Sequence, residues 1–454
     1  MKKLALLFMA IFIIAFIIKD TPLFSAKSTH PDVQFFKEQL LTTDFTKPKT
    51  VIKYGKKNPA GKEPLLVWHT VPRAVYYELE FTTELPNNPN GVELSENSLF
   101  HTQSIYTNGY YADLREYNYS KLYWRVRALD YDGNPIGVFS DAEPIYISKK
   151  VKTIPKPIIN TLDDIDGLPL PLYPVYKWIP LHDITTAYEV ELLSQPPEFE
   201  NGTQPSKYRI WSKIADDSSD CYDDFARLLT PGTYYWRVRA VDSSGNTIGT
   251  YSDTASFIIT KPASRVFAAT YGDSITHGGG AISYSPANLE YNYQTYLDFP
   301  ALNLGKSGDT STTTAERFDS DVLPFRPKNL LILCGANSLR AGTPASTIMR
   351  DLIDIRTKCF SNNIRPIFLT LLPLNPDNIY RAFNTETADN WQDELAKVNA
   401  FIRKQPYMID LEPYFYDDDG FLATKYATDG LHPDIEGKIL MAKIINAHKN
   451  LLAK

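Results

Sequence analysis

Cysteine is scarce in this 454-residue chain, which contains only Cys221, Cys334 and Cys359. The count is odd and the three lie far apart, which excludes a disulfide framework and a cysteine-based zinc site and leaves room for one bridge at most. Cys334 falls in an apolar run typical of a strand, where a lone cysteine usually serves as a small core residue. The 43% hydrophobic content can instead supply apolar cores for about three domains.

Blocks of like charge are also absent. The 47 Lys and Arg residues and the 53 Asp and Glu residues are interspersed, and the formal net charge is −6. No segment offers the basic surface that would neutralise a phosphate backbone. We therefore expect no nucleic-acid partner.

The apolar run at the N-terminus is slightly short for a membrane span. Residues 4–18 are uncharged and follow two lysines, as in an export signal, whereas a spanning helix usually needs about 17–25 residues. We predict a signal peptide or N-terminal membrane anchor in 1–26 and a linker in 27–47, although bulky Phe24 precedes the small-residue site Ser25-Ala26. The protein is expected to be exported to the periplasm, cell surface or extracellular space. The alternative, a buried N-terminal helix, would have no polar face.

The first two thirds of the chain contain an internal repeat. The run 123–130 recurs as 235–242, and further matches continue at the same offset of 112 residues. Such self-similarity indicates two copies of one structural unit. The predicted limits are 48–150 and 153–261, joined by a proline-bearing stretch.

Each copy has the pattern of a β-sandwich. Trp124, Val126 and Ala128 fall on one face of a strand, while Arg125 and Arg127 fall on the other, as in a half-buried sheet. Short strands, turn residues and the lack of a long amphipathic helix support an all-β unit. The copies resemble fibronectin type III or similar Ig-like modules. They are either spacers or sugar-binding platforms built from aromatics, for which the candidates are Tyr110, Tyr111, Tyr117 and Tyr119.

A different pattern begins after Pro262 and defines a third domain, 264–454. Apolar strand-like runs alternate with helical patterns, which predicts an α/β three-layer, doubly wound parallel sheet of flavodoxin-like type. The expected strands are 266–271, 301–304, 329–334, 366–372 and 408–411. The expected helices are 292–297, 313–322, 347–360, 387–403 and 435–452.

Four short blocks lie where these strands end, which is where such sheets carry their active sites. They centre on Ser274, Gly308, Asn337 and the pair Asp429 and His432. Ser274 is the candidate nucleophile, His432 its base, and Asp429 the group that orients the imidazole. The backbone N–H groups of Ser274 and Gly308 and the amide of Asn337 are the candidate oxyanion hole.

In these blocks the chain resembles the SGNH/GDSL hydrolase family, an esterase and lipase family. The family's Ser, Gly, Asn and His correspond to Ser274, Gly308, Asn337 and His432, and its Asp-x-x-His block to Asp429 and His432. The family commonly has Gly-x-Asn-Asp in the third block, whereas Ser338 follows Asn337 here. The resemblance implies a Ser-His-Asp esterase that forms an acyl-enzyme and needs no metal or cofactor.

Other interpretations of these residues are weaker. His277 is a rival base, but no carboxylate lies at a comparable spacing to orient it. The acids around His432 also allow a metal site, although Asp434 and Glu436 are better explained as acids that favour the dipole of the last helix. The nucleophile elbow of α/β-hydrolases is excluded because it needs a glycine at the position of Thr276. A phosphate loop is excluded because it needs a glycine at the position of Pro300.

The substrate follows only from the domain architecture. An exported esterase behind two β-sandwich modules fits deacetylation of a carbohydrate or cell-surface polymer, by analogy. A lysophospholipase or other lipid esterase and an O-acetyltransferase are the enzymatic alternatives, and a non-catalytic surface glycan-binding protein is the alternative of another class. Candidate walls of the acyl pocket are 277–284 and 374–380.

Overall fold

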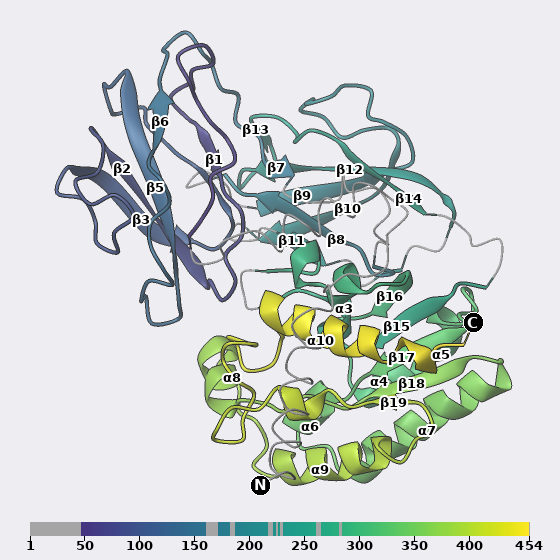
Figure 1. The fold of residues 1–454 in the computed structure, drawn as a ribbon. Helices are drawn as coiled ribbons and strands as arrows, with labels where there is room; N and C mark the ends of the chain where they lie inside the picture. Colours follow the sequence, from purple (N-terminus) through teal and green to yellow (C-terminus); the bar gives the residue numbers. More distant parts are fainter. Residues whose placement is uncertain are drawn as a thin grey trace, which may run out of the picture.

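The fold is described from a computed structural model that covers residues 47–159, 171–181, 187–216, 221–223, 226–227, 230–259, 265–280 and 284–453. The predicted export signal or anchor and nearly all of the predicted linker lie outside these residues. Within them, no helix is long and apolar enough to cross a membrane. Figure 1 shows two β-rich units beside a third unit that contains the helices of the described residues.

The first β-rich unit contains a four-stranded antiparallel sheet and a separate strand pair. The sheet has the order β3-β2-β5-β6, and the pair is β1-β4. Trp68, Tyr77 and Trp124 are buried between them, with the rings of Trp68 and Tyr77 5.2 Å apart. The strands are β1 (Leu65–Val67), β2 (Tyr76–Thr82), β3 (Ser98–Ile105), β4 (Gly109–Tyr111), β5 (Lys121–Leu129) and β6 (Glu143–Tyr146).

The second β-rich unit repeats this plan around Trp178, Tyr188 and Trp236. One sheet has the order β10-β9-β12-β13 with β14 also on β12, and the other has the order β11-β8-β7. The strands are β7 (Ile158–Ile159), β8 (Val175–Ile179), β9 (Ala187–Leu193), β10 (Arg209–Asp216), β11 (Cys221–Asp223), β12 (Gly232–Val241), β13 (Thr247–Ile248) and β14 (Ala255–Ile259). The β-rich character of both copies is confirmed, while their sandwich type and limits stay predictions.

The prediction of a half-buried sheet is wrong for β5, because its arginine face is covered as well. Arg125 is 1% exposed, and its guanidinium pairs with Glu80 at 2.6 Å and donates to the carbonyl oxygens of Asn88 and Glu93. The loop after β2 therefore folds back over Arg125. Arg127 pairs with Glu78 at 2.5 Å. Charges buried to this degree need partners, since an unpaired one would be costly.

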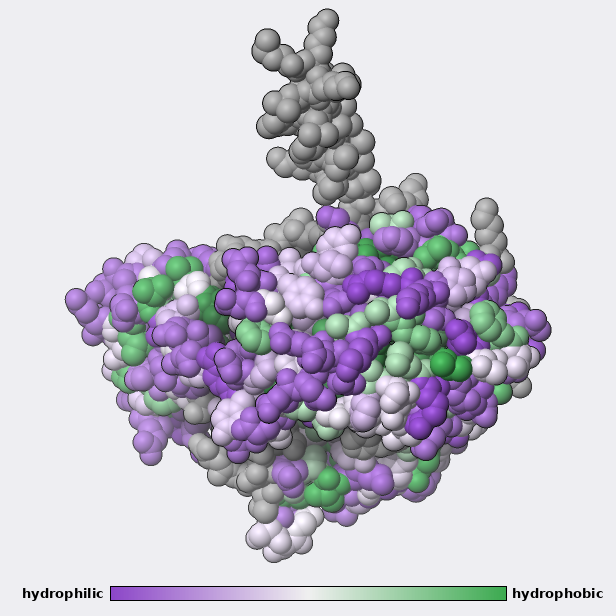
Figure 2. Space-filling model, turned by 90° about the horizontal axis from the view of Figure 1, so that it is seen from below, coloured by the Kyte–Doolittle hydropathy of each residue, from purple (hydrophilic) through white to green (hydrophobic). Residues whose placement is uncertain are grey.

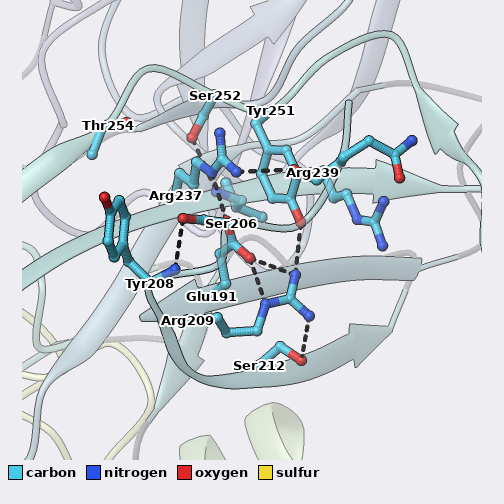
Figure 3. A network of polar contacts seen from close by, with 12 residues as sticks. Glu191, Ser206, Tyr208, Arg209, Ser212, Arg237, Arg239, Tyr251, Ser252 and Thr254 are labelled. Atoms are coloured by element: carbon cyan, nitrogen blue, oxygen red, sulfur yellow. Dashed lines mark hydrogen bonds and ion pairs between the residues drawn. The ribbon is translucent and has the colours of Figure 1, made fainter. Parts of the chain in front are cut away.

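The second unit has the same arrangement with one more arginine. Figure 3 shows Arg209 and Arg237 converging on Glu191, with Tyr251 beside them. Arg209 Nη2 also donates to the Tyr251 hydroxyl at 2.9 Å, and the Arg237 guanidinium lies 3.8 Å from the centre of that ring. Each copy thus has an apolar face and a buried ion-pair face.

The four tyrosines considered as a sugar platform do not gather on one exposed surface. Tyr111 is buried in the apolar cluster of the second unit. Tyr110 and Tyr117 pack against the cluster of the first. Only Tyr119, at 41% exposure, stands out among them. Figure 2 shows one face of the molecule as mostly hydrophilic, with small separate apolar areas.

The third unit is built on a five-stranded parallel sheet, which confirms the predicted α/β arrangement. Its order β16-β15-β17-β18-β19 places the first strand between the second and the third. In Figure 1, α10 (Ile435–Ala447) lies on one side of this sheet, and α7 (Ala345–Ser361) and α9 (Trp391–Ile402) lie on the other. The strands are β15 (Ala268–Gly272), β16 (Ala301–Gly305), β17 (Asn329–Leu333), β18 (Arg365–Leu369) and β19 (Met408–Ile409).

The helices agree less closely with the predicted ranges. The segment 292–297 forms 3-10 turns, and the expected helix 313–322 breaks at Arg317. Two short helices, α6 (Ala336–Arg340) and α8 (Pro376–Phe383), lie outside the predicted helix ranges. The helices are α3 (Ser274–His277), α4 (Ser311–Glu316), α5 (Phe318–Asp321), α6 (Ala336–Arg340), α7 (Ala345–Ser361), α8 (Pro376–Phe383), α9 (Trp391–Ile402) and α10 (Ile435–Ala447). The 3-10 turns are η1 (Leu289–Tyr291), η2 (Tyr293–Tyr296), η3 (Glu412–Tyr414) and η4 (Lys449–Leu451).

Both β-rich units share apolar clusters with the third unit. Tyr284, Tyr291 and Ile435 belong to the cluster of the first unit. Leu172 and Tyr173, which precede β8, belong to the core of the third unit. The three units therefore pack as one assembly rather than as separate modules on linkers.

Candidate active site

The strand order brings the predicted blocks to one edge of the sheet. Gly272, at the end of β15, pairs with Gly305 of β16 on one side and with Leu333 of β17 on the other. The turns that follow these three strands carry Ser274, Gly308 and Asn337. A Cβ atom at Gly272 would lie 1.8 Å from the Leu333 carbonyl oxygen. Glycine is therefore required for this close approach.

Ser274 begins the short helix α3, and Asp273 caps it. The Asp273 side chain accepts from the backbone N–H of Ile275 at 3.1 Å and from that of Gly335 at 3.3 Å. One carboxylate therefore links the nucleophile turn to the Asn337 turn. Burial raises the pKa of Asp273 to about 6, because its charged form loses hydration.

Ser274, His432 and Asp429 form one continuous chain of hydrogen bonds. Ser274 Oγ lies 2.8 Å from His432 Nε2, and His432 Nδ1 lies 2.7 Å from Asp429 Oδ2. Because a carboxylate only accepts, Nδ1 carries the proton and the lone pair of Nε2 faces the serine hydroxyl. Asp429 Oδ1 also accepts from the backbone N–H groups of Leu431 and His432, at 2.9 and 2.7 Å.

The two remaining candidates for the oxyanion hole lie in turns that are tied together. Gly308 is exposed and has a φ of 83°, a conformation that favours glycine. Asn337 Nδ2 donates to the carbonyl oxygen of Asp309 at 2.9 Å, and Lys306 N donates to that of Gly272 at 3.0 Å. These bonds hold the Gly308 turn against the two neighbouring turns.

His277, the rival base, is turned away from Ser274. It is fully buried, Nε2 lies 2.8 Å from the Tyr173 carbonyl oxygen, and Nδ1 lies 2.8 Å from Ser307 Oγ. Both ring nitrogens are thus engaged with groups other than the nucleophile. Burial lowers the pKa of His277 to about 4.

Asp434, one of the acids near His432, bonds to a helix N-terminus and to a hydroxyl group. Asp434 caps α10 through the N–H of Ile435 at 3.0 Å, and it accepts from Thr428 Oγ1 at 3.1 Å. In the part of the chain that the structure describes, no group of three His, Cys, Asp or Glu side chains is placed to hold a metal ion. Cys334 and Cys359 are buried thiols that form no disulfide.

Two buried basic side chains, which no motif indicated, donate hydrogen bonds to backbone carbonyls near the ends of the strands. Lys438 of α10 donates to the carbonyl oxygen of Ile275, the residue after Ser274, at 2.8 Å, and burial lowers the pKa of Lys438 to about 7. Arg317 donates to the carbonyl oxygens of Gly272 and Leu304, both at 2.8 Å. In the sequence, Lys438 and Arg317 were distinguished only as charged residues inside core-facing helical patterns.

The predicted pocket walls are only partly placed at the site. In the segment 277–284, Tyr284 stacks on Tyr291 with the ring centres 4.3 Å apart and joins the interface with the first β-rich unit. The segment 374–380 leads into α8, whose last residue, Phe383, lies edge-on to His432 with the ring centres 6.0 Å apart. Phe383 was not predicted from the sequence, because no motif indicated that it lies close to His432.

The hydrogen-bonded chain of Ser274, His432 and Asp429 thus lies at the carboxyl ends of the strands of a parallel α/β sheet, which is where such sheets carry their active sites. Residues 270–438 match the model of the GDSL-like Lipase/Acylhydrolase family. The C-terminal part of the chain is thus a GDSL/SGNH hydrolase domain, and the class of enzyme is a carboxylic ester hydrolase. The comparison with curated protein sequences finds no similar protein.

Solved structures with a similar fold include a lipase/acylhydrolase from Enterococcus faecalis, with 22% identity, coverage of 41% of this chain and 97% of that chain, and a TM-score of 0.34. A GDSL-like lipase from Bacteroides thetaiotaomicron has 22% identity, coverage of 43% and 93%, and a TM-score of 0.33. An acetylxylan esterase from Geobacillus stearothermophilus has 15% identity, coverage of 43% and 100%, and a TM-score of 0.30.

Proposed function

We propose that this protein is an exported serine esterase that removes acetyl groups from a carbohydrate or cell-surface polymer through an acyl-enzyme. The observation that carries the proposal is the hydrogen-bonded chain from Ser274 Oγ through His432 to Asp429, with both contacts at 2.7–2.8 Å. In such a chain the histidine can accept the serine proton, which activates the serine for nucleophilic attack without a metal or cofactor.

In the proposed reaction, Ser274 Oγ attacks the ester carbonyl while His432 Nε2 takes its proton. The oxyanion receives hydrogen bonds from the backbone N–H groups of Ser274 and Gly308 and from Asn337 Nδ2. His432 then returns the proton to the leaving alcohol as the C–O bond breaks. Water then attacks the acyl-enzyme while His432 takes its proton, and His432 gives that proton to Ser274 Oγ as the bond between Oγ and the acyl carbon breaks and the acid leaves.

The proposal of a carbohydrate polymer as substrate rests on what borders the site. The turn that follows β5 contacts α8, since Asp132 pairs with Arg381 at 2.8 Å and Tyr131 lies 5.7 Å beneath that guanidinium. Phe383, two residues after Arg381 at the same end of α8, lies edge-on to His432 with the ring centres 6.0 Å apart. A β-rich unit thus stands next to the catalytic edge. Such an arrangement suits a substrate that extends beyond the reacting ester.

The first test is hydrolysis of p-nitrophenyl acetate by wild type and by Ser274→Ala. Loss of the nucleophile should lower kcat by at least about 10³, and unchanged turnover in the variant would refute the assignment. Labelling of Ser274 by a fluorophosphonate is expected in the wild type. Glycan binding without labelling would instead indicate a non-catalytic binding protein.

Substrate class is tested separately with a series of p-nitrophenyl esters and with acetylated glycans. The proposal expects fastest turnover of acetate and release of acetate from the polymer. A preference for long acyl chains would indicate a lipid esterase. Transfer of acetate to an added sugar, in place of release, would indicate an O-acetyltransferase.

A further inference from the structure

A segment of the second β-rich unit reaches into the hydrolase domain beside the proposed oxyanion turn. Leu172 N donates to the Asn303 carbonyl oxygen of β16 at 2.8 Å. The Tyr173 hydroxyl donates to Asp321 at 2.6 Å, and its ring lies 5.1 Å from Lys306 Nζ. These contacts fix the position of the Tyr173 backbone, which lies far from the hydrolase domain in sequence.

The Tyr173 carbonyl oxygen determines which nitrogen of His277 carries the proton. A carbonyl only accepts, so the 2.8 Å contact requires a proton on His277 Nε2. His277 is neutral at ordinary pH, because burial lowers its pKa to about 4. Nδ1 is therefore left as an acceptor.

That acceptor holds the residue next to Gly308. Ser307 Oγ lies 2.8 Å from His277 Nδ1, and Ser307 N donates to the same nitrogen at 3.3 Å. The other ends of the turn are tied by Lys306 to Gly272 and by Asp309 to Asn337. Among the hydrogen bonds of the described residues, those to His277 are the ones that fix Ser307.

We infer that His277 is a positioning residue for the oxyanion turn and that the second β-rich unit, through the Tyr173 carbonyl, keeps His277 in the tautomer that this task requires. The inference rests on the proposed acyl-transfer function. It makes the β-rich unit a part of the catalytic apparatus. A single oxyanion donor contributes about 10²–10³ in kcat, so a displaced Gly308 N–H costs a measurable part of that factor.

Two matched variants of the full chain separate positioning from general packing. His277→Asn places an amide oxygen where Nδ1 stands, keeps the acceptor for Ser307 and loses the bond to Tyr173. His277→Gln keeps a donor for Tyr173 and loses the acceptor for Ser307. Each loses one side of the imidazole, so their Tm values should fall by similar amounts.

The expected result with p-nitrophenyl acetate at pH 8 is a kcat for His277→Gln about 10–100-fold below wild type, with KM within about twofold. His277→Asn should retain most of the activity. A ratio of at least about threefold between the kcat values of the Asn and Gln variants supports the inference, and a smaller ratio overturns it.

The role of Tyr173 is tested by a double-mutant cycle with Tyr173→Ala. Loss of this anchor should lower kcat when residue 277 is histidine, which needs its tautomer fixed. It should have little effect on His277→Asn, whose amide orientation is selected by Ser307 N–H itself. Equal losses in both backgrounds overturn the part assigned to Tyr173. If Tyr173→Ala does not fold, the comparison of the Asn and Gln variants still decides the role of His277.

Ser274→Ala is included in the same assays to keep the two proposals apart. Full activity of Ser274→Ala refutes the proposed function itself. An inactive Ser274→Ala together with equal kcat values for the two His277 variants refutes only the positioning inference.

Discussion

Replacing Asp429 by asparagine tests the triad with the least change in shape. Asp429 is fully buried, and its Oδ1 accepts from two backbone N–H groups while its Oδ2 accepts from His432 Nδ1. In Asp429→Asn the amide oxygen keeps the backbone bonds. The amide nitrogen, a donor, then faces Nδ1 at about the same 2.7 Å. Two donors cannot share that contact, so His432 shifts its proton to Nε2.

With the proton on Nε2, His432 can no longer accept the proton of Ser274. The same tautomer error in another Ser-His-Asp enzyme lowers kcat by about 10⁴, which corresponds to about 5 kcal/mol of transition-state stabilisation. We expect a loss of this size in kcat for p-nitrophenyl acetate, with KM changed little. A stopped assay long enough to detect 10⁻⁴ of wild-type turnover is required.

The matched control is Asp434→Asn, an isosteric change in the same loop. Asp434 is also buried, but it bonds the N–H of Ile435 and Thr428 Oγ1 rather than the imidazole. Its kcat should stay within about threefold of wild type. If Asp429→Asn kept more than a tenth of wild-type kcat, or if Asp434→Asn lost as much, the tautomer argument would be refuted.

Two further predictions concern stability. Arg125→Met leaves Glu80 buried without its cation and should destabilise the first β-rich unit by about 3–5 kcal/mol in urea unfolding. The double variant Glu80→Gln, Arg125→Met should recover much of that loss. Unfolding of Arg125→Met at the wild-type urea midpoint would contradict the prediction. Burial lowers the pKa of His277 from 6.5 to about 4, so the unfolded chain binds more protons in that window and stability is lost as pH falls through it. Between pH 7 and pH 5, wild type should lose about 2 kcal/mol more than His277→Asn, and parallel pH profiles of the two would refute this.

The blocks of the hydrolase domain could be found from sequence because they are local. Each block occupies a single turn. One block contains a glycine that packs closely against a neighbouring strand and a serine at the start of a helix, and another contains an Asp three residues before a His. The alternation of apolar runs and helical patterns then indicated a parallel sheet. That fold carries the ends of its strands to one edge, so the blocks were expected to meet.

Other features depend on residues that are distant in the chain. The sequence contains two candidate histidines for the base. Only the tertiary structure places His432 at Ser274, and it places His277 against Tyr173, which lies 104 residues earlier in the chain. Arg125 was expected to face solvent. The alternation of apolar and polar residues shows that a strand has two different faces, but it does not show what covers the polar face. Lys438 and Arg317 support the strand ends from buried positions that no motif marks.

The sequence by itself therefore determined the candidate catalytic groups, since each of them belongs to a short motif whose backbone conformation its own residues dictate. The tertiary structure alone decided which groups are neighbours and which charges are buried. Burial and partner choice arise from packing between segments that no local pattern connects, and they set which nitrogen of each histidine carries the proton.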